Sequence, residues 1–95
     1  MEIHWTKPAK HDLEIIHSYI ERDNKVAAIK VVTRIYNAIH TQLLNAPLSG
    51  RIGPVKNTRE LVLSNTPYII AYKVSEDEIY IIRILHTSLR WPNQM

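Results

Sequence analysis

The stretch YIIAYKVSEDEIYIIRIL, residues 68–85, is the part of the sequence that most clearly indicates the fold. Residues 68–74 and 79–85 are rich in β-branched and aromatic side chains, and each is about as long as one strand. The polar residues SEDE at 75–78 predict a hairpin turn, so the two strands should pair antiparallel. RELVL at residues 59–63 is a third segment of the same kind and completes a predicted three-stranded meander.

Two helices are predicted before the meander. Apolar residues recur with helical spacing in both segments, so each has one apolar stripe. The two stripes are Ala9, Leu13, Ile16 and Ile20, and Ala28, Val32, Ile35, Ile39 and Leu43. Thr6 and Asn24 are suited to cap the two N-termini, and the short connection between the helices predicts an antiparallel hairpin.

The whole chain is expected to form one domain, residues 1–95, of the α+β class. EIHW at residues 2–5 predicts a lone N-terminal strand, whereas residues 45–58 contain both glycines and predict the one long loop. The predicted order is therefore an N-terminal strand, a two-helix antiparallel hairpin and a three-stranded antiparallel meander, with the helices on one face of the sheet. A chain of 95 residues has room for one core.

Strict alternation along the last strand predicts which side chains face the helices. Those expected beneath the helices are Tyr80, Ile82 and Ile84. Those expected on the opposite face are Ile79, Ile81, Arg83 and Leu85. Because a chain of this length cannot build a third layer, the second face should meet solvent or a partner, and its aliphatic character favours a partner. Arg83 has no acidic neighbour along the strand and is expected to be open to solvent.

Composition excludes several classes of protein. The absence of cysteine excludes disulfides and thiolate metal sites and suits the cytoplasm. No apolar run reaches the ~18 residues of a membrane span, so we expect a cytoplasmic protein without membrane contact. Lys and Arg number 12 against 9 Asp and Glu, and the net charge of +3 is compatible with a nucleic-acid or acidic-protein partner.

The sequence contains no motif that assigns a chemistry. There is no glycine-rich phosphate loop, HExxH helix or EF-hand loop, and no serine lies in a nucleophile-elbow context. Four histidines lie outside the last strand and lack the spacing of metal ligands: His4, His11, His17 and His40. We therefore expect no cofactor and no metal site.

A set of basic residues in the second half is the strongest candidate for a functional surface. Its members are Arg51, Lys56, Arg59, Arg83, His86 and Arg90. They are either solvated cations that protect a sheet edge from aggregation or a cationic rim suited to phosphates or an acidic polypeptide. Trp91 is either packed back on the core or an exposed aromatic anchor.

Three segments together resemble a known family. They are WTKPAKHDLEIIHSYI (5–20), GRIGPVKNTRELVLSNTPYIIAYKV (50–74) and EIYIIRILHTSLRWP (78–92). They are similar to the ParE branch of the RelE/ParE toxins of bacterial type II toxin–antitoxin modules, and the similarity covers nearly the whole chain. The resemblance implies a two-helix hairpin packed on an antiparallel sheet. It also implies a cognate antitoxin that binds as a long, partly disordered acidic segment.

Function differs between the two branches of this family. ParE-like members poison DNA gyrase and have no catalysis of their own, whereas RelE-like members cleave mRNA in the ribosome. Nuclease members commonly carry a basic residue where the penultimate strand begins, and this sequence has Tyr68 and Ile69 there. They also tend to place a polar aromatic residue near the end of the final strand, where Thr87 follows His86. These departures favour the gyrase-directed function, encoded in a plasmid-stabilisation type of module.

The resemblance and the residue pattern together predict two surfaces. Target-binding residues are expected to be Arg59, Arg83, His86, Arg90 and Trp91. Antitoxin-binding residues are expected to be Ile79, Ile81, Leu85 and Arg51. No catalytic residue is expected. In the alternative of an mRNA endoribonuclease, Arg59, Arg83 and His86 would assist phosphoryl transfer. A degenerate toxin that only binds its antitoxin is the third alternative.

Overall fold

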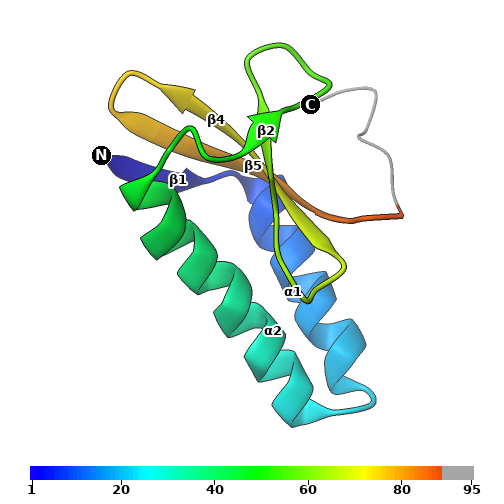
Figure 1. The fold of residues 1–95 in the computed structure, drawn as a ribbon. Coiled ribbons are helices and arrows are strands. Elements are labelled where there is room, and N and C mark those ends of the chain that lie inside the picture. The colour runs from blue at the N-terminus through cyan, green and yellow to red at the C-terminus, as the bar shows by residue number, and fades with distance from the viewer. Residues whose placement is uncertain (89–95) are drawn as a thin grey trace.

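The chain folds into a five-stranded sheet with two helices packed on one face, as the computed structural model, which describes residues 1–88, shows (Figure 1). The elements are β1 (Glu2–Trp5), α1 (Lys7–Glu21), α2 (Lys25–Asn37), η1 (Ala38–Leu43), β2 (Arg51–Ile52), β3 (Arg59–Val62), β4 (Tyr68–Ser75) and β5 (Glu78–His86). The strand order across the sheet is β1-β5-β4-β3-β2. The predicted α+β class and the order of its elements are confirmed.

Both helices begin at the predicted caps. The side-chain oxygen of Thr6 accepts a hydrogen bond from the Ala9 N–H at 3.3 Å, and that of Asn24 accepts one from the Ala27 N–H at 2.9 Å. These bonds satisfy amide groups that the first helical turn leaves without partners. The second helix continues directly into η1, a π-helical turn that the apolar spacing did not predict.

The sheet has two strands that the sequence did not place in it. β1 runs parallel to β5, with Glu2 opposite Glu78 and Trp5 opposite Ile81. β2 lies within the predicted long loop and pairs with β3 over two residues, Arg51 and Ile52. The predicted antiparallel pairing of β3, β4 and β5 is confirmed. As a result β5 is flanked on both sides near its start, and its last residues extend beyond the end of β1.

The predicted faces of β5 are wrong for the residues before a β-bulge, whereas Arg83 and Ile84, which follow it, lie on the predicted faces. Tyr72 of β4 lies opposite Ile81, but the preceding residue, Ala71, lies opposite Arg83, so Ile82 is an extra residue. Such an insertion shifts every later side chain to the other face. Ile79 and Ile81 belong to the core cluster beneath the helices and are fully buried. The prediction that these two face a partner is therefore wrong, because the helices already cover them.

The outcome differs among the other residues of this strand. Tyr80 and Ile82 were expected beneath the helices but do not belong to the core cluster, whereas Ile84 does, as predicted. Leu85 is buried outside that cluster, and Arg83 alternates with Ile84 toward the opposite face. The bulge thus places Arg83 at the free edge of β5, close to α1.

The segment between η1 and β2 is fixed to the sheet by Tyr72. The buried hydroxyl of Tyr72 donates to the Pro47 carbonyl at 2.8 Å and accepts from the Gly50 N–H at 2.9 Å. Gly50 lies so close to the ring that a Cβ there would be 2.6 Å from the Tyr72 hydroxyl oxygen and 2.8 Å from the Glu60 carbonyl oxygen. The glycine is required by this close approach, because neither atom is the end of a flexible chain.

Gly50→Ala should therefore destabilise the protein by about 2 kcal/mol, since the backbone must shift away from a buried ring. Thermal unfolding of the variant measures the loss. Ser49→Ala is the matched control, because Ser49 is exposed and the change introduces alanine at the adjacent position without adding a carbon atom. A Gly50→Ala protein that melts with the wild type would show that the contact is not rigid.

Candidate partner-binding groove

A groove runs between α1 and the C-terminal end of β5, with a volume of about 490 Å³. We call it the α1–β5 groove. Its lining residues come from α1, from the start of β4 and from the end of β5: Asp12, Ile15, Ile16, Tyr19, Tyr68, Arg83, Ile84, Leu85, His86 and Ser88. The groove exists because β1 stops at Trp5, so α1 takes the place of a strand along that edge of the last residues of β5, opposite the edge that pairs with β4.

The apolar wall of the groove is the exposed side of α1. Ile15 and Tyr19 are one helical turn apart, and 51% and 67% of their respective surfaces are exposed. A second hollow of about 420 Å³ lies on the other side of the same two residues and includes His11 and Arg22. Ile15 and Tyr19 therefore form an apolar ridge with a concave surface on each side, which is typical of a protein-binding site.

His86 provides the polar end of the groove. Its ring meets the edge of Tyr68, with ring centroids 5.7 Å apart. Its Nδ1 accepts the backbone N–H of Ser88 at 3.1 Å and lies 2.7 Å from the Ser88 hydroxyl oxygen. An Nδ1 that accepts a backbone N–H leaves the proton of the neutral ring on Nε2. Burial, and then the nearby Tyr19, raise the pKa of Tyr68, which keeps its phenol neutral at physiological pH.

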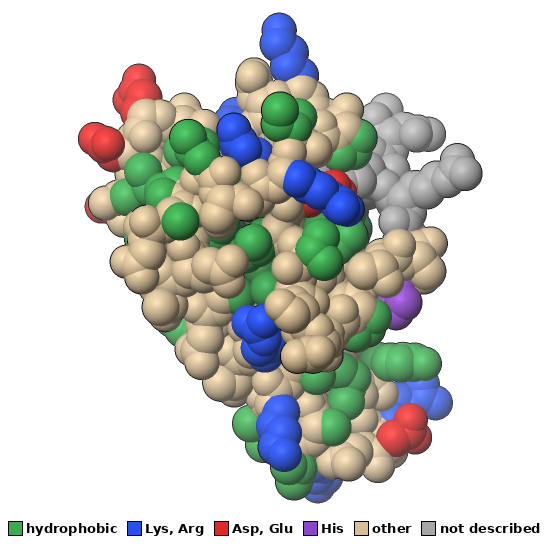
Figure 2. All heavy atoms as spheres, viewed as in Figure 1, with side chains coloured by type: hydrophobic (Ala, Val, Ile, Leu, Met, Phe, Trp, Pro, Cys, Tyr) green, Lys and Arg blue, Asp and Glu red, His purple; other side chains and the backbone are tan. Residues whose placement is uncertain are grey.

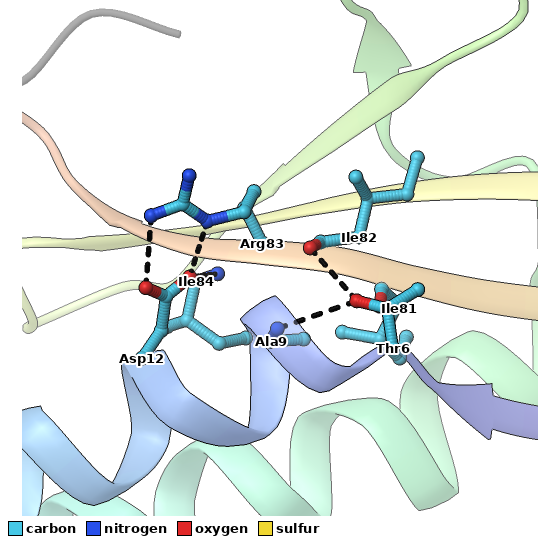
Figure 3. Close-up of polar contacts among 7 residues, drawn as sticks. All are labelled: Thr6, Ala9, Asp12, Ile81, Ile82, Arg83 and Ile84. Atoms are coloured by element: carbon cyan, nitrogen blue, oxygen red, sulfur yellow. Dashed lines mark hydrogen bonds and ion pairs between the residues drawn. The ribbon is translucent and has the colours of Figure 1, made fainter. Parts of the chain in front are cut away.

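Arg83 is held by Asp12 in a bidentate ion pair (Figure 3). The Arg83 Nε donates to Asp12 Oδ2 at 2.7 Å and its Nη2 donates to Oδ1 at 2.9 Å. Asp12 Oδ2 also accepts the backbone N–H of Ile84 at 3.0 Å. These hydrogen bonds raise the pKa of Arg83 above its already high usual value. The Asp12 side chain is only 11% exposed, so this carboxylate replaces the missing strand at the edge of β5.

The prediction that Arg83 is open to solvent and unpaired is therefore wrong. Its acidic partner lies on α1, 71 residues away in sequence. Thr6 provides a hydrogen-bond donor for the β5 carbonyl groups just before Arg83. Its hydroxyl lies 2.9 Å from the Ile81 carbonyl oxygen and 3.0 Å from that of Ile82 (Figure 3). Thr6 and Asp12 together join the first turns of α1 to the unpaired edge of β5.

Two of the other predicted cations are also engaged within the chain. Arg59 Nη1 donates to the carbonyls of Gly50 at 2.8 Å and Leu48 at 3.3 Å, so it supports the segment before β2. Arg51 Nε donates to Glu60 at 2.9 Å, although the Arg51 side chain is largely exposed. Lys and Arg side chains are scattered among apolar ones on the face drawn in Figure 2, without a single basic cluster.

The structure brings only part of the predicted site together. Arg83, Leu85 and His86 all line the α1–β5 groove, whereas Arg59 and Arg51 lie at the β2–β3 end of the sheet. Arg90 and Trp91 lie outside the described residues. Ile15 and Tyr19 were not among the predicted site residues. In a helical projection they lie next to the apolar stripe of α1 but do not belong to it. Among residues 1–88, no helix is both long and apolar enough to cross a membrane.

Comparison with known proteins gives consistent matches over nearly the whole chain. The family model described as ParE toxin of type II toxin–antitoxin system, parDE, matches residues 3–91. The chain is 46% identical over 90 residues to Y4kP of Sinorhizobium fredii, a protein named as a toxin, which covers 95% of this chain and 92% of that protein. It is 33% identical over 87 residues to Toxin RelE2 of Caulobacter vibrioides, covering 92% and 96% respectively.

A solved structure described as the chromosomal ParDE TA system from P. aeruginosa is similar in fold. The TM-score is 0.77 at 30% sequence identity, and the superposition covers 90% of this chain and 95% of that one. The sheet and helix hairpin described above are thus shared with a toxin–antitoxin protein.

Proposed function

Because the chain belongs to the ParE family of type II toxin–antitoxin toxins, we propose that it arrests growth by binding DNA gyrase and that a cognate antitoxin neutralises it. The observation that carries the gyrase-directed proposal is that Arg59 and Arg83 are already hydrogen-bonded within the chain. Cleavage of mRNA needs a base, a proton donor and cations placed on the developing charge of the phosphate. Of the three residues suited to this role, Arg59 binds carbonyls and Arg83 binds Asp12.

The engaged arginines support a toxin that acts by binding. A guanidinium that already donates to a carboxylate would have to give up two charge-assisted hydrogen bonds to reach a phosphate. Arg59 and His86 also lie on β3 and β5, which are separated by β4. The described residues thus do not assemble an acid, a base and a phosphate clamp around one point.

One observation keeps the mRNA endoribonuclease as the second candidate. His86 lies at the end of an open groove, and in its neutral form the Nε2 proton meets no acceptor in the described part of the chain. A similar protein is also named as a RelE toxin. A single histidine supplies one of the roles that phosphoryl transfer requires, so this candidate stays second.

We place the antitoxin on the α1–β5 groove and its apolar ridge. Ile15 and Tyr19 offer apolar surface worth about 25 cal/mol per Å² once covered, and His11, Arg22 and His86 lie around it. An acidic, partly disordered segment with apolar anchors would match both features, and its charges would mainly set the association rate. Leu85 stays part of the proposed interface as a lining residue of the groove.

Expression of the chain without its antitoxin tests the proposal in cells. We expect growth arrest with filamentation and a DNA-damage response, because a gyrase poison leaves broken or tangled chromosomes. Co-expression of the antitoxin encoded beside the toxin gene should restore growth. A culture that grows normally would contradict the proposed activity and would indicate a degenerate toxin that only binds its antitoxin.

A further inference from the structure

Three potential metal ligands converge at the start of the β1–β5 pair, far along the sheet from the α1–β5 groove. Glu2 and His4 lie on β1, and Glu78 lies on β5. Their ligand atoms all lie within 4.8 Å of one another, and among residues 1–88 they form the only such group of three. The register of the parallel pair places Glu2 opposite Glu78 and His4 opposite Tyr80, so these four side chains share one face of the sheet.

The separations between the ligand atoms suit coordination of one ion. His4 Nε2 lies 3.1 Å from a Glu78 carboxylate oxygen and 3.6 Å from a Glu2 carboxylate oxygen. Ligands bound tetrahedrally at about 2.0–2.2 Å from Zn²⁺ are roughly 3.3–3.6 Å apart. Glu2 is the most exposed of the three, with 77% of its side chain accessible, and is free to adjust its approach.

Tyr80 orients two of the three ligands. Its hydroxyl donates to the second carboxylate oxygen of Glu78 at 2.7 Å, and its ring stacks on the His4 imidazole with centroids 5.1 Å apart. The hydrogen bond from Tyr80, and then the one from His4, lower the pKa of Glu78. Partners that hold metal ligands in this way are typical of the surroundings of metal sites.

The local charge favours a cation at this position. Glu2 and Glu78 are directly opposite each other in the sheet, an arrangement of like charges that destabilises strand pairing. Glu76 and Asp77 of the adjacent turn line the same hollow as these two residues. Acidic side chains are visible at the corner of the molecule that carries the β4–β5 turn (Figure 2). A protein with a net charge of +3 therefore concentrates carboxylates at one end of its sheet.

We propose that Glu2, His4 and Glu78 bind a divalent transition-metal ion of the Zn²⁺ class, which clamps the N-terminal strand to β5. One imidazole and two carboxylates suit Zn²⁺ and related divalent transition-metal ions, whereas Ca²⁺ and Mg²⁺ prefer ligand sets made entirely of oxygen. Two carboxylates neutralise the charge of the ion and the ion removes the repulsion between them. His4 would bind the ion through Nε2 of its neutral ring, with the ring proton on Nδ1.

Titration of the untagged, full-length chain with ZnCl₂, followed by calorimetry, tests the site. We expect saturable binding of one ion per chain and a rise in melting temperature with Zn²⁺, because the ion binds the folded state only. His4→Ala and Glu78→Gln should each weaken binding by at least about 10-fold and remove the rise in melting temperature.

Two matched variants distinguish metal coordination from the mere loss of a histidine or of a nearby negative charge. His17→Ala removes a histidine that lies 3.7 Å from Glu21 in the same kind of pair but that belongs to no group of three potential ligands within residues 1–88. Glu76→Gln removes a neighbouring negative charge without removing a proposed ligand. Both should bind Zn²⁺ within about 2-fold of the wild type.

Three results would overturn the proposal. The first is the absence of saturable Zn²⁺ binding, which would leave His4 as an ordinary partner of two carboxylates. The second is a loss of Zn²⁺ affinity in His17→Ala or Glu76→Gln as large as that in His4→Ala or Glu78→Gln. The third is binding of Ca²⁺ or Mg²⁺ as tight as that of Zn²⁺, which would indicate diffuse attraction by the carboxylates. None of these depends on whether the chain inhibits gyrase.

Discussion

Asp12→Ala should destabilise the protein by about 3 kcal/mol, although Asp12 lies on a helix at the surface of the molecule. The substitution leaves the Arg83 guanidinium without its bidentate partner and the Ile84 N–H without an acceptor. A hydrogen bond to a charged group contributes about 1.5–3 kcal/mol, and three such bonds end on this one carboxylate. Chemical denaturation of the variant measures the change.

Controls separate the ion pair from a general effect of removing an acid from α1. Glu14→Ala removes an exposed carboxylate on the same helix and should change stability by less than about 0.5 kcal/mol. Arg83→Ala should cost nearly as much as Asp12→Ala, and the double variant should cost clearly less than the sum. An Asp12→Ala protein as stable as the Glu14→Ala protein would contradict the structural role of the pair.

Ile15→Asp should weaken binding of the cognate antitoxin by about 100-fold, the size expected for a central interface residue. The new carboxylate would lie on the apolar ridge and would repel an acidic segment as well as remove apolar contact. Because Ile15 is half exposed, the fold should tolerate the change. Growth arrest should then persist in cells that also express the antitoxin, and calorimetry with the two purified proteins gives the loss of affinity.

Ile29→Asp is the matched control for this experiment. Ile29 is an exposed isoleucine of α2, with 60% of its surface accessible, and it lines neither of the hollows beside Ile15. The same change of charge there should leave neutralisation intact. Equal losses from both variants would indicate a nonspecific charge effect, and no loss from Ile15→Asp would place the antitoxin on another surface.

Most of the architecture was predictable because its signals are local. Thr6 and Asn24 cap the helices through contacts within three residues, and the polar turn before Glu78 sets the β4–β5 hairpin. The bulge was not predictable, because residues 79–85 are almost all apolar or aromatic apart from Arg83, so no polar–apolar alternation marks the extra residue. The parallel pairing of β1 with β5 joins the two ends of the chain and has no local signal.

The candidate site was less predictable than the fold, because its contacts join residues that are far apart in the sequence. Arg83 has only aliphatic neighbours along its strand, so its partner Asp12 becomes visible only when α1 packs against β5. His86 lies at the end of the last strand and lines the groove, while its predicted role in target binding stays a prediction. Ile15 and Tyr19 were overlooked because exposed apolar residues gain meaning only beside a concave surface.

The most direct test of the proposed function compares two purified systems. The chain is added to DNA gyrase in supercoiling and cleavage reactions and, separately, to translating ribosomes supplied with mRNA. We predict inhibited supercoiling or trapped gyrase–DNA cleavage complexes together with intact mRNA, because Arg59 and Arg83 are engaged in holding the fold. Ribosome-dependent cuts in the mRNA, with gyrase activity unchanged, would contradict the account and would place His86 in a nuclease site.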